Sequence, residues 1–136
     1  MNHAGANEPT MTTYGSWLRR PGAPSSRLAA GVMLLVILEL TVATALIHLS
    51  LGGVLFTLNG LGYLGLAVAY LAAVLIPLPL VRRYSWLPRV GLAAYAAVTI
   101  GAYLVIGPYF TLGWITKGIE LAIIGLVTVD LLVGRT

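Results

Sequence analysis

The sequence predicts an all-α protein, a bundle of four transmembrane helices with a flexible N-terminal tail. The first observation behind this prediction is composition: of 136 residues, 59% are hydrophobic and only 9% are charged, whereas soluble domains carry about 25% charged residues. The second is four apolar runs, each about long enough to cross the ~30 Å hydrocarbon core of a bilayer. A soluble core cannot hide so much apolar surface, so we expect the lipid bilayer to surround the chain.

The elements are expected in a simple order along the chain. Residues 1–27 are rich in Gly, Pro, Ser, Thr and Asn, which predicts a flexible cytoplasmic tail. A transmembrane domain of residues 28–136 follows. Its first connection, residues 49–59, carries no charge and is compatible with partial embedding, and the other two connections are short. The predicted spans are residues 28–48, 60–80, 90–110 and 114–133.

The basic residues predict the orientation of these spans. Arginines precede the first span, separate the second from the third and follow the fourth, whereas Lys117 alone falls on the other side. Because Lys and Arg are enriched in cytoplasmic connections, both termini are expected to face the cytoplasm, in the cell (inner) membrane. The arginines are Arg19, Arg20, Arg27, Arg82, Arg83, Arg89 and Arg135.

An alternative for the first apolar run is a cleaved signal peptide. Basic residues precede the run, and Ala43-Thr44-Ala45 resembles a small-residue cleavage site. The run continues well past this point and further spans follow, so we favour an uncleaved span.

The sequence excludes several classes of function. The absence of cysteine removes disulfides, thiolate metal sites and cysteine nucleophiles. The net charge of +4 comes from basic residues divided among the connections, which does not suit nucleic-acid binding. No nucleophile elbow, P-loop or H-E-x-x-H motif occurs. We therefore predict a protein that is not an enzyme and that holds no metal or cofactor.

One candidate polar site lies near the predicted midplane. Ionisable groups inside a span are costly and usually face the bundle interior or a water-filled cavity. Glu39 lies at the centre of the first span, and tyrosine hydroxyls within lipid need partners. Two alternatives remain: a polar cavity around Glu39, or a protonated Glu39 hydrogen-bonded to Tyr70 or Thr99. The candidate residues are Glu39, Tyr70, Thr99 and Tyr103.

Two further polar groups are expected at the ends of the spans. An outer cluster consists of His48, Asn59, Lys117 and Glu120. Lys117 and Glu120 are three residues apart, which allows a local ion pair, and both are better partners for His48 than a metal. His48 remains a candidate single axial ligand for a haem or a chlorophyll. At the inner boundary, Asp130 is expected to pair with Arg82, Arg83 or Arg89, because a membrane-embedded acid needs a partner.

Small residues recur every four positions on the two middle spans. Such spacing lets helix backbones approach closely, which predicts tight helix packing and favours a homo-oligomer or association with other membrane subunits. The residues are Gly65, Ala69 and Ala73 on one span and Ala93, Ala97 and Gly101 on the other.

Several segments resemble a family of small, uncharacterised prokaryotic integral membrane proteins with four spans. They are "LIHLSLG", "LNGLGYLGL", the basic inter-span loop, "AVTIGAYL" and "LGWITKGIELAIIGL". The resemblance implies the four-span fold and no activity or cofactor. The stretch "ILELTVATAL" is also similar to the first span of small multidrug resistance transporters, which implies a central glutamate that releases its proton to a cationic substrate. The third span lacks the tryptophan that those transporters use.

We therefore predict a non-enzymatic multi-pass protein, an accessory or structural subunit or a small sensor of a membrane assembly. The first alternative is a proton-coupled transporter or channel of small molecules or cations that uses Glu39. The second is a haem- or chlorophyll-binding subunit that uses His48.

Overall fold

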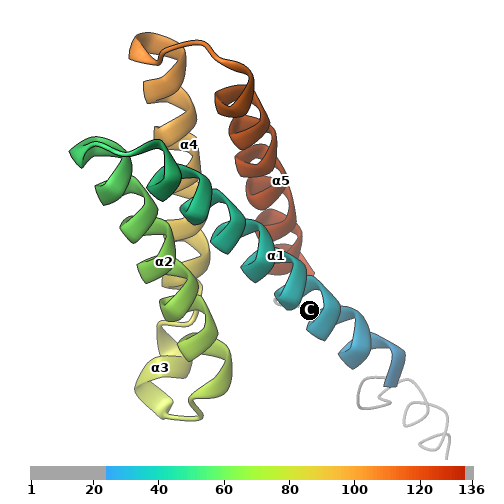
Figure 1. The fold of residues 1–136 in the computed structure, drawn as a ribbon. Coiled ribbons are helices and arrows are strands. Elements are labelled where there is room, and N and C mark those ends of the chain that lie inside the picture. Colours follow the sequence, from blue (N-terminus) through green and yellow to red (C-terminus); the bar gives the residue numbers. More distant parts are fainter. Residues whose placement is uncertain (1–23, 134–136) are drawn as a thin grey trace, which may run out of the picture.

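The structure, a computed structural model, describes residues 24–133 as helices joined by short loops, with no strand in this range (Figure 1). The all-α prediction is confirmed. Most of the predicted tail lies outside the described residues, as do Arg19, Arg20 and Arg135, whereas residues 24–27 already belong to the first helix. The helices are α1 (Pro24–Leu51), α2 (Val54–Leu75), α3 (Pro79–Arg83), α4 (Trp86–Ile106) and α5 (Thr111–Val133).

Three described helices are long and apolar enough to cross a membrane, and not the predicted four. They are Arg27–Leu51, Val54–Leu75 and Trp86–Ile106. The remaining long helix, α5, is set apart by the charged side chains of Lys117, Glu120 and Asp130 along its length. The exposed surface of the helices is nevertheless strongly apolar and includes Leu35, Leu61, Val98 and Ile115, which is the surface expected of a membrane protein.

The first connection is much shorter than the sequence suggested. Gly52 and Gly53 have φ angles of +69° and +83°, a conformation that glycine adopts without the steric penalty of a side chain. The chain therefore reverses within these two residues, and α2 begins at Val54 instead of residue 60. The uncharged segment after them is the first turn and a half of a helix.

Prolines shift the other helix ends. Pro77 and Pro79 disfavour helical geometry in the residues before them, so α2 ends at Leu75, five residues before the predicted boundary. Pro79 then occupies the first turn of α3, where its missing N–H costs nothing. Gly107 and Pro108 end α4 in the same way at Ile106.

The four long helices form a closed ring in which α1 packs against α2, α2 against α4, α4 against α5, and α5 against α1. Figure 1 shows the α1–α2 and α4–α5 connections at one end, here called the turn end, and α3 at the other, the α3 end. It also shows α1 crossing the bundle obliquely, with its N-terminal part extending beyond the other helices.

The interior of the ring combines large side chains with close helix contacts. Ile37, Tyr63, Leu92 and Ile123 are fully buried. Where α1 crosses α2, a Cβ atom on Gly60 would lie 2.7 Å from Cγ of Leu49 and 2.8 Å from the carbonyl oxygen of Ala45. Only glycine permits this approach, so Gly60 fixes the distance between the two helices.

Most of the small residues predicted to pack these helices together do not do so within the chain, although Ala93 packs against the core. Gly65, Ala69, Ala97 and Gly101 are exposed, and a Cβ atom on Gly65 or Gly101 would meet nothing within 4 Å. The prediction was therefore wrong for these four residues. Residue spacing identified a stripe of small residues, but it did not show whether that stripe faces the interior of the bundle or its outer surface.

We predict that Gly60→Ala destabilises the fold by about 1–3 kcal/mol, the usual cost of overfilling a packed contact. Gly65→Ala is the matched control on the same helix, because its added methyl group meets no neighbour, and it should stabilise the fold by up to about 1 kcal/mol through helix propensity. Unfolding in bicelles by steric trapping measures both values. Equal effects for the two variants would contradict the close α1–α2 contact.

Candidate functional site

The central feature near the turn end is a buried triad of His48, Lys117 and Glu120. Glu120 is completely buried, and His48 and Lys117 are only 4% and 6% exposed. The Lys117 ammonium donates to Oε2 of Glu120 at 2.5 Å, and it lies 5.5 Å from the centre of the Tyr103 ring. Burying an ionised carboxylate is costly unless it is paired, so the lysine stabilises Glu120 as its counter-ion.

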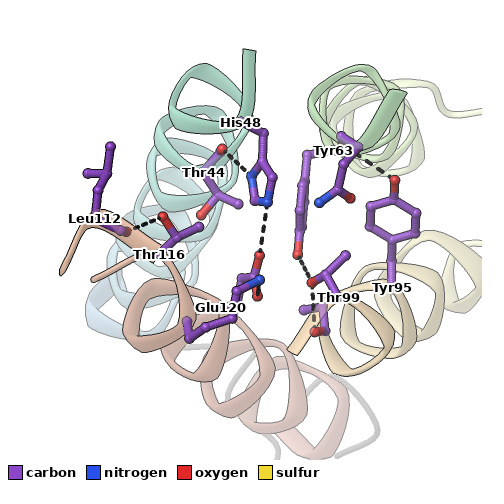
Figure 2. Close-up of polar contacts among 11 residues, drawn as sticks. Thr44, His48, Tyr63, Tyr95, Thr99, Leu112, Thr116 and Glu120 are labelled. Carbon is purple, nitrogen blue, oxygen red and sulfur yellow. Dashed lines mark hydrogen bonds and ion pairs between the residues drawn. The ribbon is translucent and has the colours of Figure 1, made fainter. Parts of the chain in front are cut away.

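The second oxygen of the Glu120 carboxyl group faces the imidazole. Oε1 lies 3.8 Å from Nε2 of His48, and it is buried without a hydrogen bond. Nδ1 of His48 lies 2.8 Å from the carbonyl oxygen of Thr44; since a carbonyl only accepts, Nδ1 carries the proton. Figure 2 shows the two side chains pointing toward each other from α1 and α5.

This geometry leaves one proton unaccounted for. When the ring is neutral with its proton on Nδ1, Nε2 is an acceptor, and a carboxylate oxygen is also an acceptor. Two acceptors therefore face each other in a buried place. One proton on Nε2, or one donor group from a bound molecule, would satisfy both atoms.

Tyr63 and Thr99 lie beside the triad and join α2 to α4 (Figure 2). Thr99 donates to the carbonyl oxygen of Ala96 at 2.9 Å. Since a threonine has one hydroxyl proton, Tyr63 is the donor in its 2.8 Å bond to Thr99. The Tyr63 ring also packs 5.7 Å from the imidazole of His48, centre to centre.

A cavity of about 310 Å³ adjoins the triad. Its polar lining includes His48, Asn59, Thr99 and Lys117. The rest is mostly apolar and comes chiefly from the first turns of α2 and the last turns of α4, where side chains such as Leu58 and Ile106 are strongly exposed. The cavity therefore reaches from the buried triad to the apolar outer surface between α2 and α4.

The structure brings together most of the predicted outer cluster. His48, Lys117 and Glu120 form one group, as expected from their similar heights. Asn59 lines the adjoining cavity, and its carbonyl oxygen accepts a 3.3 Å hydrogen bond from Tyr95. The pairing of Tyr63 with Thr99 was not anticipated, although Tyr63 comes four residues after Asn59 and seven before Tyr70 and so shares a helix face with both.

The predicted pairing of Asp130 is present toward the α3 end, with one of its three candidate arginines. Arg89 donates to Oδ2 of Asp130 at 2.6 Å, whereas Arg82 and Arg83 are exposed. Tyr70 donates to the same oxygen at 2.6 Å, and the Arg89 guanidinium lies 5.2 Å from the centre of the Tyr70 ring. This group connects α2, α4 and α5.

The predicted midplane site does not exist as one group. Tyr70 belongs to the Asp130 group, and Thr99 and Tyr103 line the cavity. Glu39 is exposed on α1 and is not among the cavity-lining residues. The heights were estimated from the sequence, but the rotation of α1 about its axis turns Glu39 away from the interior.

The site offers little to a metal or a haem. Within residues 24–133, no group of three or more His, Asp or Glu side chains is placed to hold a metal ion. Both ring nitrogens of His48 face protein atoms, with Nδ1 on Thr44 and Nε2 toward Glu120. An axial ligand must present one nitrogen to the open face of a macrocycle, so this arrangement does not suit that role.

Comparison of the chain with protein-family models, with curated proteins and with solved structures finds no match.

We predict that Tyr70→Phe costs about 1.5–3 kcal/mol of stability, because it removes a short hydrogen bond to a charged acceptor. Tyr95→Phe is the control: its 3.3 Å bond to a carbonyl oxygen is long and neutral, and its loss should cost less than about 1 kcal/mol. Unfolding in bicelles compares the two. A Tyr95→Phe cost equal to or above that of Tyr70→Phe would contradict the assigned role of Asp130.

Proposed function

We propose that this protein is a non-enzymatic multi-pass sensor subunit of a prokaryotic cell membrane. Its sensing site is the triad of His48, Lys117 and Glu120 together with the adjoining cavity. The observation that carries the proposal is Oε1 of Glu120, a buried oxygen without a hydrogen bond that faces Nε2 of His48 at 3.8 Å. A buried polar atom left without a partner is costly, so the site is poised to take up a proton or a donor group.

The membrane placement rests on how the charges of α5 are paired. Lys117 is paired with Glu120 and Asp130 with Arg89, and paired charges facing the interior are tolerated in membrane helices. We infer that α5 is the fourth span. Arg82, Arg83 and Arg89 belong to the α3 end, whereas Lys117 belongs to the turn end. Basic residues mark the cytoplasmic side, which supports cytoplasmic termini and an outward-facing triad.

The cavity indicates the kind of molecule that the site would bind. Its apolar lining and exposed rim between α2 and α4 suit a small amphiphile arriving from the outer leaflet. The polar lining then suits a head group that donates one hydrogen bond. His48 and Lys117 both line the cavity and both contact Glu120, so an occupant of the cavity changes the partners available to the buried carboxylate.

The triad also explains how binding would be transmitted. His48 lies on α1 and Glu120 on α5, so their contact spans one side of the helix ring. A proton on Nε2 turns two opposed acceptors into a charge-assisted hydrogen bond, which is shorter and stronger than a neutral one. Occupation of the site therefore draws α1 and α5 together at the turn end, and a partner subunit packed on these helices would detect that change.

Proton-coupled transport is a second candidate function. The same two facing acceptors, His48 and Glu120, beside a cavity that reaches the apolar outer surface favour this function at the triad instead of at Glu39. Proteoliposomes loaded with a pH-sensitive dye distinguish the two functions. If the protein is a transporter, wild type should give a proton flux that Glu120→Gln abolishes. If it is a sensor, the proton flux should stay at background in both wild type and Glu120→Gln.

The first prediction from this proposal concerns the proton on His48. The chain has two histidines, so His3→Ala leaves His48 as the only signal in ¹⁵N-histidine NMR of the protein in liposomes. We expect the Nδ1–H form of the neutral ring, and a changed Nε2 signal in Glu120→Gln, because the substitution replaces the carboxyl group that faces Nε2. Thr116→Val, which removes a neighbouring hydroxyl bonded to Leu112, is the control and should leave the Nε2 signal unchanged.

An Nε2–H ring in the neutral protein would contradict the hydrogen bond to Thr44. An Nε2 signal that is the same in wild type and Glu120→Gln would contradict the sensing triad.

The second prediction concerns the cavity. Lys117 is the only lysine, so ¹⁵N-lysine labelling reports on the site with one side-chain signal. Decanol, a small amphiphile with one hydroxyl donor, should shift the Lys117 signal in a saturable way. Ala102→Phe should abolish this shift, because Ala102 lines the cavity, whereas Ala97→Phe, which is exposed on the same helix outside the cavity, should preserve it. Equal responses in both variants would contradict amphiphile binding at this cavity.

A further inference from the structure

An acidic side chain lies on the outside of a membrane helix. Glu39 is exposed near the middle of α1, within the apolar segment Arg27–Leu51. No hydrogen bond or ion pair joins it to another residue within 24–133. A carboxyl group that faces hydrocarbon without a partner is costly, and intramembrane ionisable residues almost always pair. Glu39 therefore has no partner among the described residues of this chain, and a second chain can supply one.

The side chains around Glu39 form a regular stripe. Moving along α1, exposed residues follow one another at steps of four, three, four, three and four residues. This spacing is typical of a helix face that packs against a second helix with a left-handed crossing, in water and in membranes. The stripe consists of Leu28, Val32, Leu35, Glu39, Val42 and Leu46.

The opposite face of α1 is already occupied. Ile37, Thr41 and Ala45 are completely buried in the bundle, where α1 packs against α2 and α5. Figure 1 shows the N-terminal part of α1 extending beyond its neighbours, which leaves the first half of the stripe uncovered by other described helices. α1 thus has one face committed to the fold and a second face free for another helix.

We propose that a second copy of this chain docks on the stripe, so that two α1 helices form a parallel, two-fold symmetric pair with the two Glu39 carboxyl groups in contact at its centre. A neutral carboxyl group has one donor and one acceptor, so two of them related by a two-fold axis satisfy each other with two hydrogen bonds. A two-fold axis brings the same residue of both chains together.

The chemistry of the chain argues against an asymmetric contact. Among the described basic residues of the long helices, Lys117 and Arg89 already bind carboxylates, and Arg27 lies near the start of α1, twelve residues before Glu39. Arg82 and Arg83 belong to the short α3 at the end of the bundle, far along the helices from the middle of α1. A polar residue at the centre of an otherwise apolar helix contact also sets the register of the helix pair. Glu39 sets this register only when it lies opposite Glu39 of the second copy.

Cysteine cross-linking in native membranes tests this interface, because the chain contains no cysteine. Single variants Val32→Cys, Leu35→Cys and Val42→Cys should each give a disulfide-linked dimer on mild oxidation. Val68→Cys is the control: this α2 residue is 68% exposed but lies off the stripe, and it should remain monomeric. Mass spectrometry of the cross-linked band identifies the second chain.

The role of Glu39 is tested in the Leu35→Cys background. Glu39→Ala should lower the cross-linked fraction about tenfold, the size expected for a polar contact between membrane helices. Glu39→Gln retains a donor and an acceptor and should keep cross-linking near that of wild type. Because Glu39 is exposed, neither change disturbs the core, and the ¹⁵N signal of Lys117 confirms that both variants are folded.

Cross-linking that is equal at Val68 and on the stripe, or a band containing a different protein, would overturn the proposed dimer. An unchanged cross-linked fraction in Glu39→Ala would overturn the pairing of the carboxyl groups. The cross-linking readouts do not involve the triad, so they are independent of the sensing function.

Discussion

The charged side chains of α5 have to be neutralised inside the helix ring, and much of the arrangement follows from this constraint. Glu120 is completely buried, so its carboxylate needs the Lys117 ammonium beside it. Asp130 draws Arg89 from α4 and Tyr70 from α2 to one oxygen. An ion removed from water is tolerated only with such partners. The Asp130 group therefore ties α5 to α2 and α4 at a defined height, whereas Lys117 neutralises Glu120 from within α5 itself.

The two charged groups are not equivalent. Asp130 and Arg89 are each about one-fifth exposed. Oδ2 of Asp130 accepts hydrogen bonds from both Tyr70 and Arg89, so we interpret this group as a structural connection between helices. The triad is more deeply buried and is one donor short at Oε1 of Glu120. A satisfied buried network gives rigidity, whereas an unsatisfied one is sensitive to any proton or ligand that completes it. This difference is why we assign function to the turn end.

Several features could be predicted from residues alone because they depend on distance along one helix. Lys117 and Glu120 are three residues apart and so share a helix face, and the height of His48 follows from about 1.5 Å of rise per residue. These rules correctly grouped the triad. Features that depend on helix ends were predicted less well, since the reversal at Gly52 and Gly53 and the breaks at Pro77 and Pro79 depend on local backbone geometry.

By itself, the sequence determined the helical class, the apolar surface and the grouping of His48, Lys117 and Glu120. Composition and helical rise are properties of the chain and need no neighbours. Only the tertiary structure decided which way each helix is rotated. That rotation turned Glu39 and the small residues Gly65 and Gly101 outward and brought Tyr63 onto Thr99. Where lipid surrounds a bundle, both faces of a helix are apolar, so hydrophobic periodicity no longer distinguishes the inside from the outside.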